Sequence, residues 1–106
     1  MALQITDSNF NSTILSSDKL SMIEFGAAWC GPCRAMEPLI EELSNTYAGK
    51  VNIGKVDLDT NPKLSVNYGV TSVPAILWFK NGQLIDKQLG AVAKHLLDRK
   101  IQAHLQ

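Results

Sequence analysis

Residues 20–27 are apolar on both faces of the strand that this segment is expected to form. Strands of this kind lie at the centre of a sheet that helices cover on both sides. A helix is predicted to follow over residues 32–48, because apolar side chains recur there at helical spacing. These positions are Met36, Leu39, Ile40, Leu43 and Tyr47. A buried strand that leads directly into an amphipathic helix is typical of α/β folds.

The rest of the chain continues this alternation of strands and helices. Strands are predicted at residues 3–6, 51–58, 75–79 and 83–89, and helical segments around residues 10–14, 62–68 and 93–105. Asn81-Gly82 predicts a tight hairpin between the last two strands. Strands separated by helices imply parallel pairing, and the hairpin adds an antiparallel pair. We therefore expect an α/β fold of order βαβαβαββα, with a central mixed β-sheet flanked by helices on both faces.

Two local features concern the helix ends and interior. Asp7 or Ser8 is expected to cap the short first helix, because Asp and Ser side chains accept hydrogen bonds from free N–H groups there. Pro38 falls inside the predicted long helix, where proline removes a backbone hydrogen bond and is expected to kink the helix.

Length and charge limit the possible functions. The chain has 106 residues, 45% of them hydrophobic, which predicts a single domain over residues 1–106. Ten basic and ten acidic residues give a net charge of zero, which argues against nucleic acid or a membrane as partner. The longest apolar run, residues 75–79, is far shorter than the roughly 20 residues of a membrane span. The first residues lack a leader pattern, so we expect a cytoplasmic protein. We also expect a monomer.

The only two cysteines lie in Cys30-Gly31-Pro32-Cys33, at the junction of strand and helix. One helical turn places their Cα atoms about 5–6 Å apart, so they can form a disulfide. Closing so short a loop stabilises a fold by only about 2 kcal/mol, which favours a chemical role over a structural one. A helix N-terminus favours the thiolate form of a cysteine that lies there over its thiol form. We expect an exposed Cys30 that acts as the nucleophile and a more buried Cys33 that resolves the mixed disulfide.

A zinc site is the main alternative use of the cysteines. The pair supplies only two of the four ligands that zinc needs. His95 and His104 are nine residues apart on the last predicted helix, which is not ligand spacing. No metal is therefore expected.

Glu24 interrupts the apolar strand between Ile23 and Phe25. A carboxylate in that place is costly unless it is protonated, hydrated or paired. One hypothesis is a general base with a raised pKa that deprotonates Cys33 as it attacks the mixed disulfide. The alternative is a structural ion pair with Lys55 on the adjacent strand. The two are compatible, since Lys55 could tune the acid, and we favour the base.

The segment Trp29-Cys30-Gly31-Pro32-Cys33-Arg34, followed by Pro38, Val73-Pro74 and Gly90-Ala91, resembles the thioredoxin family, and the resemblance covers essentially the whole chain. It implies a thioredoxin fold and a protein-disulfide reductase that is itself reduced by thioredoxin reductase. NADPH would be the ultimate electron donor without binding to this chain, and no cofactor would be bound. The lack of a Gly-x-Gly-x-x-Gly segment agrees with that.

The resemblance also implies a substrate groove. Pro74 would be cis, and the backbone of Val73 would pair with the substrate chain, a mode that needs little side-chain specificity. The residues that the resemblance places around disulfide-containing protein substrates are Trp29, Gly31, Pro32, Val73, Pro74, Gly90 and Ala91.

Three residues depart from the family pattern. Glu24 stands where the family usually has Asp, Gly26 where an aromatic is common, and Ala75 where threonine is usual. We expect an active enzyme with an altered redox poise or partner range. Two other functions remain open: an extracytoplasmic oxidant or isomerase of the same fold, and a redox-independent interaction or chaperone module that uses the same apolar groove.

Overall fold

Five strands form one sheet in the order β1-β3-β2-β4-β5 in the computed structural model, which describes residues 1–106. The strands are β1 (Leu3–Gln4), β2 (Leu20–Gly26), β3 (Val51–Asp57), β4 (Ala75–Lys80) and β5 (Gln83–Leu89). Strands β1 and β2 run parallel to β3, whereas β4 runs antiparallel to β2 and to β5. The mixed sheet predicted from the sequence is confirmed.

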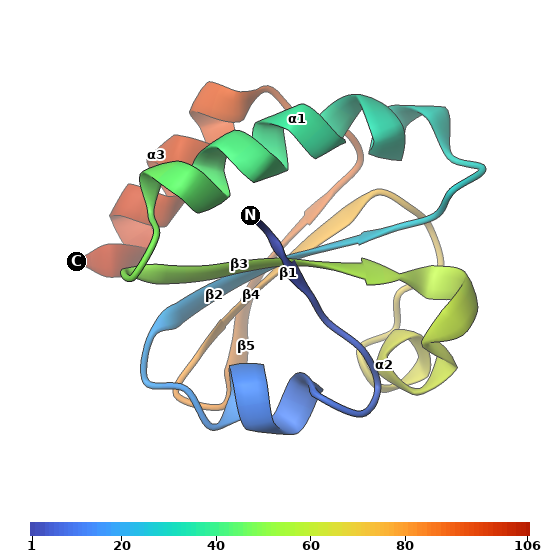
Figure 1. Cartoon of the computed structure of the whole chain (residues 1–106), viewed down its shortest axis with the longest axis horizontal. Coiled ribbons are helices and arrows are strands. Elements are labelled where there is room, and N and C mark those ends of the chain that lie inside the picture. Colours follow the sequence, from blue (N-terminus) through green and yellow to red (C-terminus); the bar gives the residue numbers. More distant parts are fainter.

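Helices cover both faces of this sheet, as predicted. The elements are α1 (Gly31–Thr46), α2 (Pro62–Asn67), α3 (Lys94–Leu105), a π-helical turn η1 (Asn11–Leu15) and a 3-10 turn η2 (Leu58–Thr60). Figure 1 shows α1 and α3 together on one face, with α2 and η1 on the other. None of these helices is both long and apolar enough to cross a membrane.

The core on the α1 and α3 face joins Met22, Ile53 and Trp78 of the sheet to Ile40 of α1 and Leu97 of α3. All five side chains are buried, and Trp78 is fully inaccessible to solvent. Successive side chains of a strand point to opposite faces. Glu24, two residues after Met22 in β2, therefore points toward α1 as well.

The opposite face has its own core, formed by Phe25 and Phe79 of the sheet against Phe10, Ile14 and Leu64. Phe10 packs edge-to-face on Phe79, with ring centroids 5.2 Å apart. Both faces of the central strand β2 are thus covered, which explains why its sequence shows no polar alternation.

The hairpin between β4 and β5 turns at the predicted dipeptide. Asn81 has a φ of 52° and Gly82 a φ of 78°, and positive φ at both central residues is what a tight two-residue hairpin turn requires. The pairing register sets Ala75 opposite Leu89, and it shifts by a bulge between Trp78 and Phe79.

The predicted cap of the first helix is wrong. Phe10 precedes η1, and no side chain caps that turn. The carboxylate of Asp7 instead accepts hydrogen bonds from the backbone N–H groups of Lys63 and Leu64, at 3.2 and 2.9 Å. These groups belong to the first turn of α2, whose free N–H donors attract a carboxylate. Asp7 therefore joins the N-terminal segment to α2.

Other boundaries differ by a few residues. Strand β1 is shorter than predicted, and β3 ends at Asp57 because its side chain accepts a hydrogen bond from the N–H of Asp59 at 2.9 Å and starts η2. Helix α1 continues through Pro38, which lies inside it. Tyr47 forms the C-terminal cap of α1, and Gly49 follows with a φ of 82°.

Candidate active site

The two cysteines lie where strand β2 has ended and helix α1 begins. Cys30 is the N-cap residue of α1, and Cys33 lies one turn into the helix. They form a disulfide with a Cα–Cα distance of 5.3 Å, in agreement with the spacing predicted from the sequence. The N–H of Cys33 donates a hydrogen bond to the Sγ atom of Cys30 at 3.2 Å. A free helix N–H therefore points at the Cys30 sulfur and would favour its thiolate in the reduced protein.

The expected difference in exposure between the cysteines is absent from the disulfide form. Cys30 is 5% exposed and Cys33 4% exposed. The reason is that Cys30 packs under the loop before β4, where its Sγ lies 3.9 Å from the carbonyl oxygen of Val73. The two cysteines therefore differ in what surrounds them and not in their overall exposure.

Cys33 faces the interior, next to Gly26 of β2. A Cβ atom placed on Gly26 would lie 3.5 Å from the Sγ of Cys33 and 3.9 Å from the Cδ of Glu24. Both side chains line one cavity of about 180 Å³, together with Glu37 and Lys55. Gly26 thus lies beside both the Cys33 sulfur and the Glu24 carboxyl group and places no side chain next to either.

Glu24 is 3% exposed, and its Oε2 atom is buried without a hydrogen-bond partner. The pKa of Glu24 is raised from 4.5 to about 7, and this is the net effect of burial, which raises it most, of Lys55, which lowers it, and of Glu37, which raises it. Desolvation is the largest of these causes, because a charged carboxylate loses water in this place. The carboxyl group therefore changes its protonation near neutral pH.

Lys55 is the direct neighbour of Glu24 across β2 and β3. Its ammonium group nevertheless pairs with Glu41 of α1, at 3.5 Å from Nζ to Oε1. The ion pair between Glu24 and Lys55 that the sequence left open is not among those of the structure. The difference in exposure favours the pair of Lys55 with Glu41. The Glu41 side chain is 36% exposed and keeps part of its hydration when it is charged, whereas Glu24 is buried.

The residues expected to bind substrate come from three segments. The Val73–Pro74 peptide is cis, as the resemblance implied. The N–H of Gly90 donates to the carbonyl oxygen of Pro74 at 2.9 Å, which joins the Val73–Pro74 loop to the end of β5. Ala91 follows Gly90 and is exposed.

The third segment is the one around the cysteines. Gly31 and Pro32 are exposed in the first turn of α1. Trp29 is 68% exposed, and its indole N–H donates to Oδ2 of Asp59 at 2.9 Å. This bond, which the sequence did not predict, fixes a large apolar ring at the surface beside the disulfide.

Comparison with known proteins decides the family. The thioredoxin family model matches residues 1–103. The chain belongs to the thioredoxin family. Thioredoxin 2 of Chlorobaculum tepidum is 42% identical over 102 residues, which cover 96% of this chain and 94% of that protein. Thioredoxin 1 of a Nostoc species is 41% identical over 104 residues, covering 98% and 97% of the two chains.

Membership of the thioredoxin family and the Cys30–Cys33 disulfide make this protein a thiol–disulfide oxidoreductase. Thioredoxin of Staphylococcus saprophyticus is 41% identical over 103 residues, which cover 97% of both chains. The fold class predicted from the sequence is confirmed. The redox-independent module and the oxidant or isomerase are not favoured.

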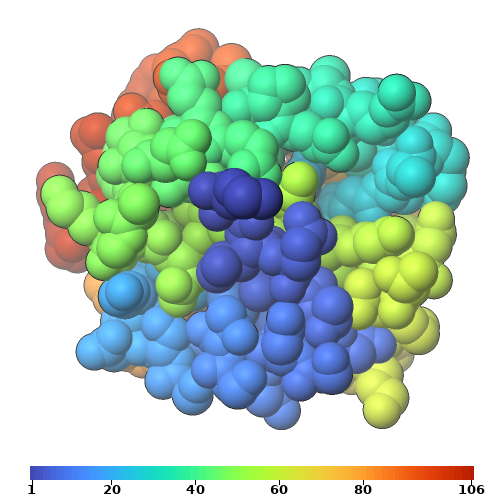
Figure 2. Space-filling view, viewed as in Figure 1, coloured from blue at the N-terminus to red at the C-terminus, as the bar shows by residue number.

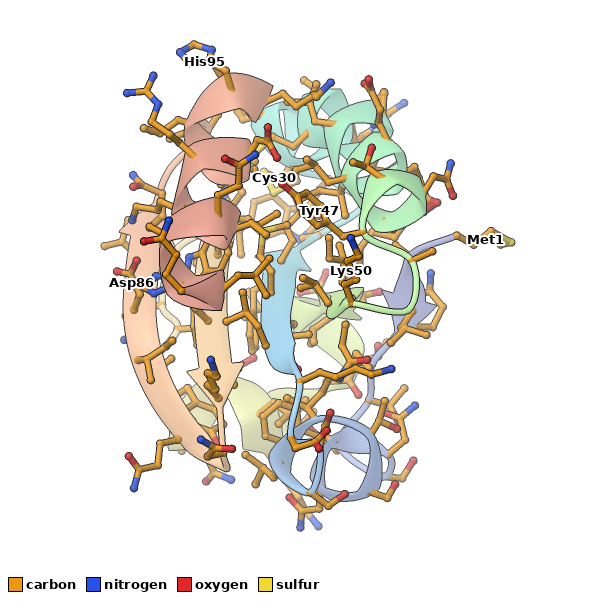
Figure 3. All side chains as sticks on the ribbon, turned by 90° about the vertical axis from the view of Figure 1, so that its left-hand side faces the viewer. Met1, Cys30, Tyr47, Lys50, Asp86 and His95 are labelled. Atoms are coloured by element: carbon orange, nitrogen blue, oxygen red, sulfur yellow. A yellow bond between two sulfur atoms is a disulfide. The ribbon has the colours of Figure 1, made fainter.

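The histidines of this thioredoxin-family chain lie apart from the cysteines. Nε2 of His104 is 3.0 Å from Oδ2 of Asp86 on β5. His95 projects from the first turn of α3 into solvent (Figure 3). No cluster of three or more His, Cys, Asp and Glu side chains is arranged to hold a metal ion.

Sequence reasoning missed two acidic residues of α1 that belong to the surroundings of Glu24. Glu37 lines the cavity, and Glu41 holds Lys55. Neither belongs to the apolar positions from which the helix is predicted. The signal that could have found them is their spacing, because Cys33, Glu37 and Glu41 are four residues apart and share one helical face.

Proposed function

We propose that this thioredoxin-family protein reduces disulfides in other proteins, with Cys30 as nucleophile and Cys33 as resolving thiol. The Cys30 thiolate attacks one sulfur of the substrate disulfide, whose S–S bond breaks as a mixed disulfide forms. The displaced substrate thiolate takes up a proton. The support is that Cys30 accepts the N–H of Cys33 and faces the Val73 loop, whereas Cys33 faces inward.

In the second step Cys33 attacks the Sγ atom of Cys30. The Cys33 thiol first gives its proton to the carboxylate of Glu24. The Cys30–Cys33 bond then forms, the bond from Cys30 to the substrate breaks, and the second substrate sulfur leaves as a thiolate that is protonated. The substrate gains two electrons from the two cysteines and two protons from the solvent, to which the proton of Cys30, lost on ionisation, and that of Cys33, released by Glu24, return.

The observation that carries this role of Glu24 is the cavity that it shares with Cys33. The cavity of about 180 Å³ is large enough to hold water, and we propose that a water bridges the carboxyl group and the thiol. A pKa of about 7 gives Glu24 enough basicity to take a proton while a fraction of it is ionised. We propose that the positive charge of Lys55, on β3, adjusts the pKa of Glu24.

Substrate docking is proposed to use the backbone of Val73 and the shallow surface around it. The carbonyl oxygen of Val73 is 3.9 Å from the Cys30 sulfur, so a chain paired with that backbone would bring its own disulfide to Cys30. On the other side of the Val73–Pro74 loop, the N–H of Gly90 donates a hydrogen bond to the carbonyl oxygen of Pro74. Trp29, Gly31, Pro32 and Ala91 are exposed around it and offer an apolar contact for varied partners.

Partners and location follow from the same family membership. We propose that thioredoxin reductase regenerates the dithiol, with NADPH bound by the reductase and no cofactor bound by this chain. The chain would act as a monomer of one domain, residues 1–106, in the cytoplasm, with neither nucleic acid nor a membrane as partner. A net charge of zero fits a protein that meets many protein surfaces.

A trapping experiment tests the assignment of the two cysteines. The reduced Cys33→Ser variant is mixed with a pure protein that carries surface disulfides, and the products are separated without reductant. Cys33→Ser should accumulate a mixed disulfide through Cys30, because the resolving thiol is missing. The matched variant Cys30→Ser should form none, and the proposal is overturned if Cys30→Ser traps as much substrate as Cys33→Ser does.

A further inference from the structure

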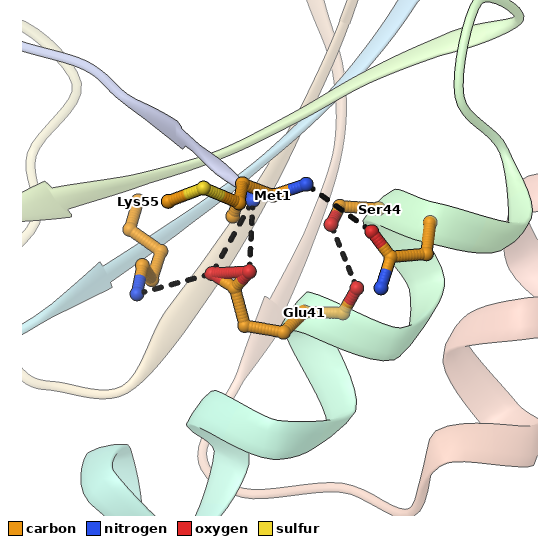
Figure 4. A network of polar contacts seen from close by, with 6 residues as sticks. Met1, Glu41, Ser44 and Lys55 are labelled. Carbon is orange, nitrogen blue, oxygen red and sulfur yellow. Dashed lines mark hydrogen bonds and ion pairs between the residues drawn. The ribbon is translucent and has the colours of Figure 1, made fainter.

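A polar network ties the N-terminus, α1 and β3 together beside the cavity (Figure 4). The N–H of Ala2 donates to both carboxylate oxygens of Glu41, at 3.3 and 3.0 Å. The same carboxylate holds Nζ of Lys55 at 3.5 Å. The N-terminal ammonium group of Met1 donates to Oδ1 of Asn45, one turn further along α1, at 3.1 Å. Figure 2 shows the N-terminal residues, in dark blue, lying on the surface against the green part of the chain that includes the end of α1.

Lys55 lies between its ion-pair partner Glu41 and its strand neighbour Glu24. It is the register partner of Glu24 in the parallel pair of β2 and β3, and neighbours in such a pair point to the same face about 4.8 Å apart. Both residues line the cavity. A lysine side chain is long and flexible enough to turn to either side. In the structure it turns to Glu41 and leaves Oε2 of Glu24 without a partner.

Lys55 is the only cation among the side chains that line the cavity. The ionisable groups that face Glu24 are Lys55 and Asp57 from β3, and Cys33 and Glu37 from α1, with Glu41 one turn further along that helix. Gln4 is the contribution of β1, and β4 presents Ile76 opposite Glu24. The position of one ammonium group therefore decides how much positive charge Glu24 receives.

We propose that Glu41 is a positioning residue of this redox site: it holds the ammonium group of Lys55 away from Glu24 and thereby sets the pH at which Glu24 accepts the proton of Cys33. The inference rests on the proposed role of Glu24 as the base for Cys33. It adds that the carboxylate of Glu41 and the N-terminal backbone that orients it belong to the same machinery.

Glu41 is suited to hold Lys55 at every pH at which the site would work. The backbone N–H of Ala2 and the charge of Lys55 hold the pKa of Glu41 below its ordinary value. Glu41 is therefore ionised while Glu24 is still protonated, and it offers Lys55 a fixed charge when Glu24 offers none. Without the charge of Glu41, the carboxyl groups that share the cavity with Lys55 are Glu24, Glu37 and Asp57, and Glu24 is its register partner in the sheet.

The test is an NMR titration of the Glu24 side-chain carboxyl carbon in the oxidised protein. Glu41→Gln keeps one oxygen to accept the N–H of Ala2 but removes the charge that holds Lys55. We expect the midpoint of Glu24 to fall by about one pH unit, a tenfold weaker proton affinity, because an opposite charge at close range lowers a carboxyl pKa. Glu42→Gln is the matched control, since Glu42 is exposed and pairs with Lys94 at 2.6 Å.

A second background separates an effect through Lys55 from a direct effect of the lost negative charge. In Lys55→Met, adding Glu41→Gln should leave the Glu24 midpoint where Lys55→Met alone puts it. The proposal is overturned if Glu41→Gln shifts Glu24 no more than Glu42→Gln does, or if it lowers the midpoint equally in both backgrounds.

The rate of mixed-disulfide resolution, measured against pH in the same variants, distinguishes this inference from the proposed function. If the Glu24 midpoint moves and the rate profile moves with it, both stand. If the midpoint moves and the rate profile does not, Glu41 still positions Lys55, and the role of Glu24 as base is wrong. If the midpoint does not move, the positioning role is wrong whatever the rates are.

Discussion

Gly26 lies beside Cys33: a Cβ atom on Gly26 would stand 3.3 Å from the Cβ of Cys33. Cys33 cannot move away easily, because helix α1 and the disulfide to Cys30 both hold it. A side chain at Gly26, the last residue of β2, would therefore have to be accommodated by a shift of the backbone or of Cys33.

Gly26→Ala is therefore expected to destabilise the oxidised protein by about 1 kcal/mol, since overpacking beside a fixed group forces small backbone shifts. The free energy of unfolding, measured in urea, tests this. Gly31→Ala is the control, because no atom lies within 4 Å of a Cβ placed on Gly31. Equal stability of Gly26→Ala and the unmodified protein would mean that Cys33 is free to yield.

Glu24 should make stability depend on pH. The unfolded chain releases the Glu24 proton near its ordinary pKa of 4.5, whereas burial holds the pKa in the folded protein at about 7. Between these values the folded state binds more protons, so stability falls as the pH rises. A shift of this size corresponds to roughly 3 kcal/mol at most.

The measurement for Glu24 is the free energy of unfolding of the oxidised protein and of Glu24→Gln at several pH values. The difference between the two should grow in favour of Glu24→Gln from about pH 4.5 to about pH 7 and stay constant above. A difference that does not change with pH would show that Glu24 titrates normally in the folded state.

Asp7 is predicted to stabilise α2 from a distance in sequence. Asp7→Ala removes the acceptor for the N–H groups of Lys63 and Leu64 and should cost about 1 kcal/mol of unfolding free energy. Ser8→Ala is the control, because the Ser8 hydroxyl contacts only Oγ1 of Thr6 at the exposed surface. If thermal or urea unfolding ranks Ser8→Ala as the more damaging change, the cap is assigned to the wrong residue.

Tyr47 links the C-terminal end of α1 to the middle of α3 through its hydroxyl group, which donates to Oδ1 of Asp98. Burial raises the pKa of Tyr47, and its bond to Asp98 raises it further, so the hydroxyl stays protonated and keeps donating. Tyr47→Phe should lower the unfolding free energy by about 1–2 kcal/mol, because a hydrogen bond to a charged acceptor is lost. Tyr68→Phe should change it little, since the ring of Tyr68 packs on Phe10 and Phe79 through its edges and faces.

The fold and the cysteine pair were predictable from the sequence, because both depend on local patterns. Helical spacing after residues 20–27 placed α1, and Asn81-Gly82 placed the hairpin. The polar residue inside an apolar strand marked Glu24, because a buried carboxyl group is costly wherever it occurs.

What sequence reasoning missed depends on contacts between distant segments. Asp7 caps α2 instead of the helical turn that follows it, because the fold brings the first turn of α2, 57 residues away in sequence, to its carboxylate. Lys55 pairs with Glu41 and not with Glu24. The carboxylate of Glu41 is oriented by the N–H of Ala2, which lies 39 residues before Glu41 in the sequence. Local patterns predict that Asp7 caps a helix and that Lys55 pairs with an acid, and only the fold determines which one.

The central claim is that Glu24 takes the proton of Cys33 during resolution of the mixed disulfide. The direct measurement is the rate of that step in a single turnover, followed by stopped flow from about pH 6 to about pH 9 in the unmodified protein, Glu24→Gln and the control Glu42→Gln. The rate should rise with a midpoint near 7 in the unmodified protein and in Glu42→Gln. Glu24→Gln should lose that rise and be slower by about 100-fold, the usual contribution of a positioned base. Equal rates in Glu24→Gln and the unmodified protein over this range would contradict the claim.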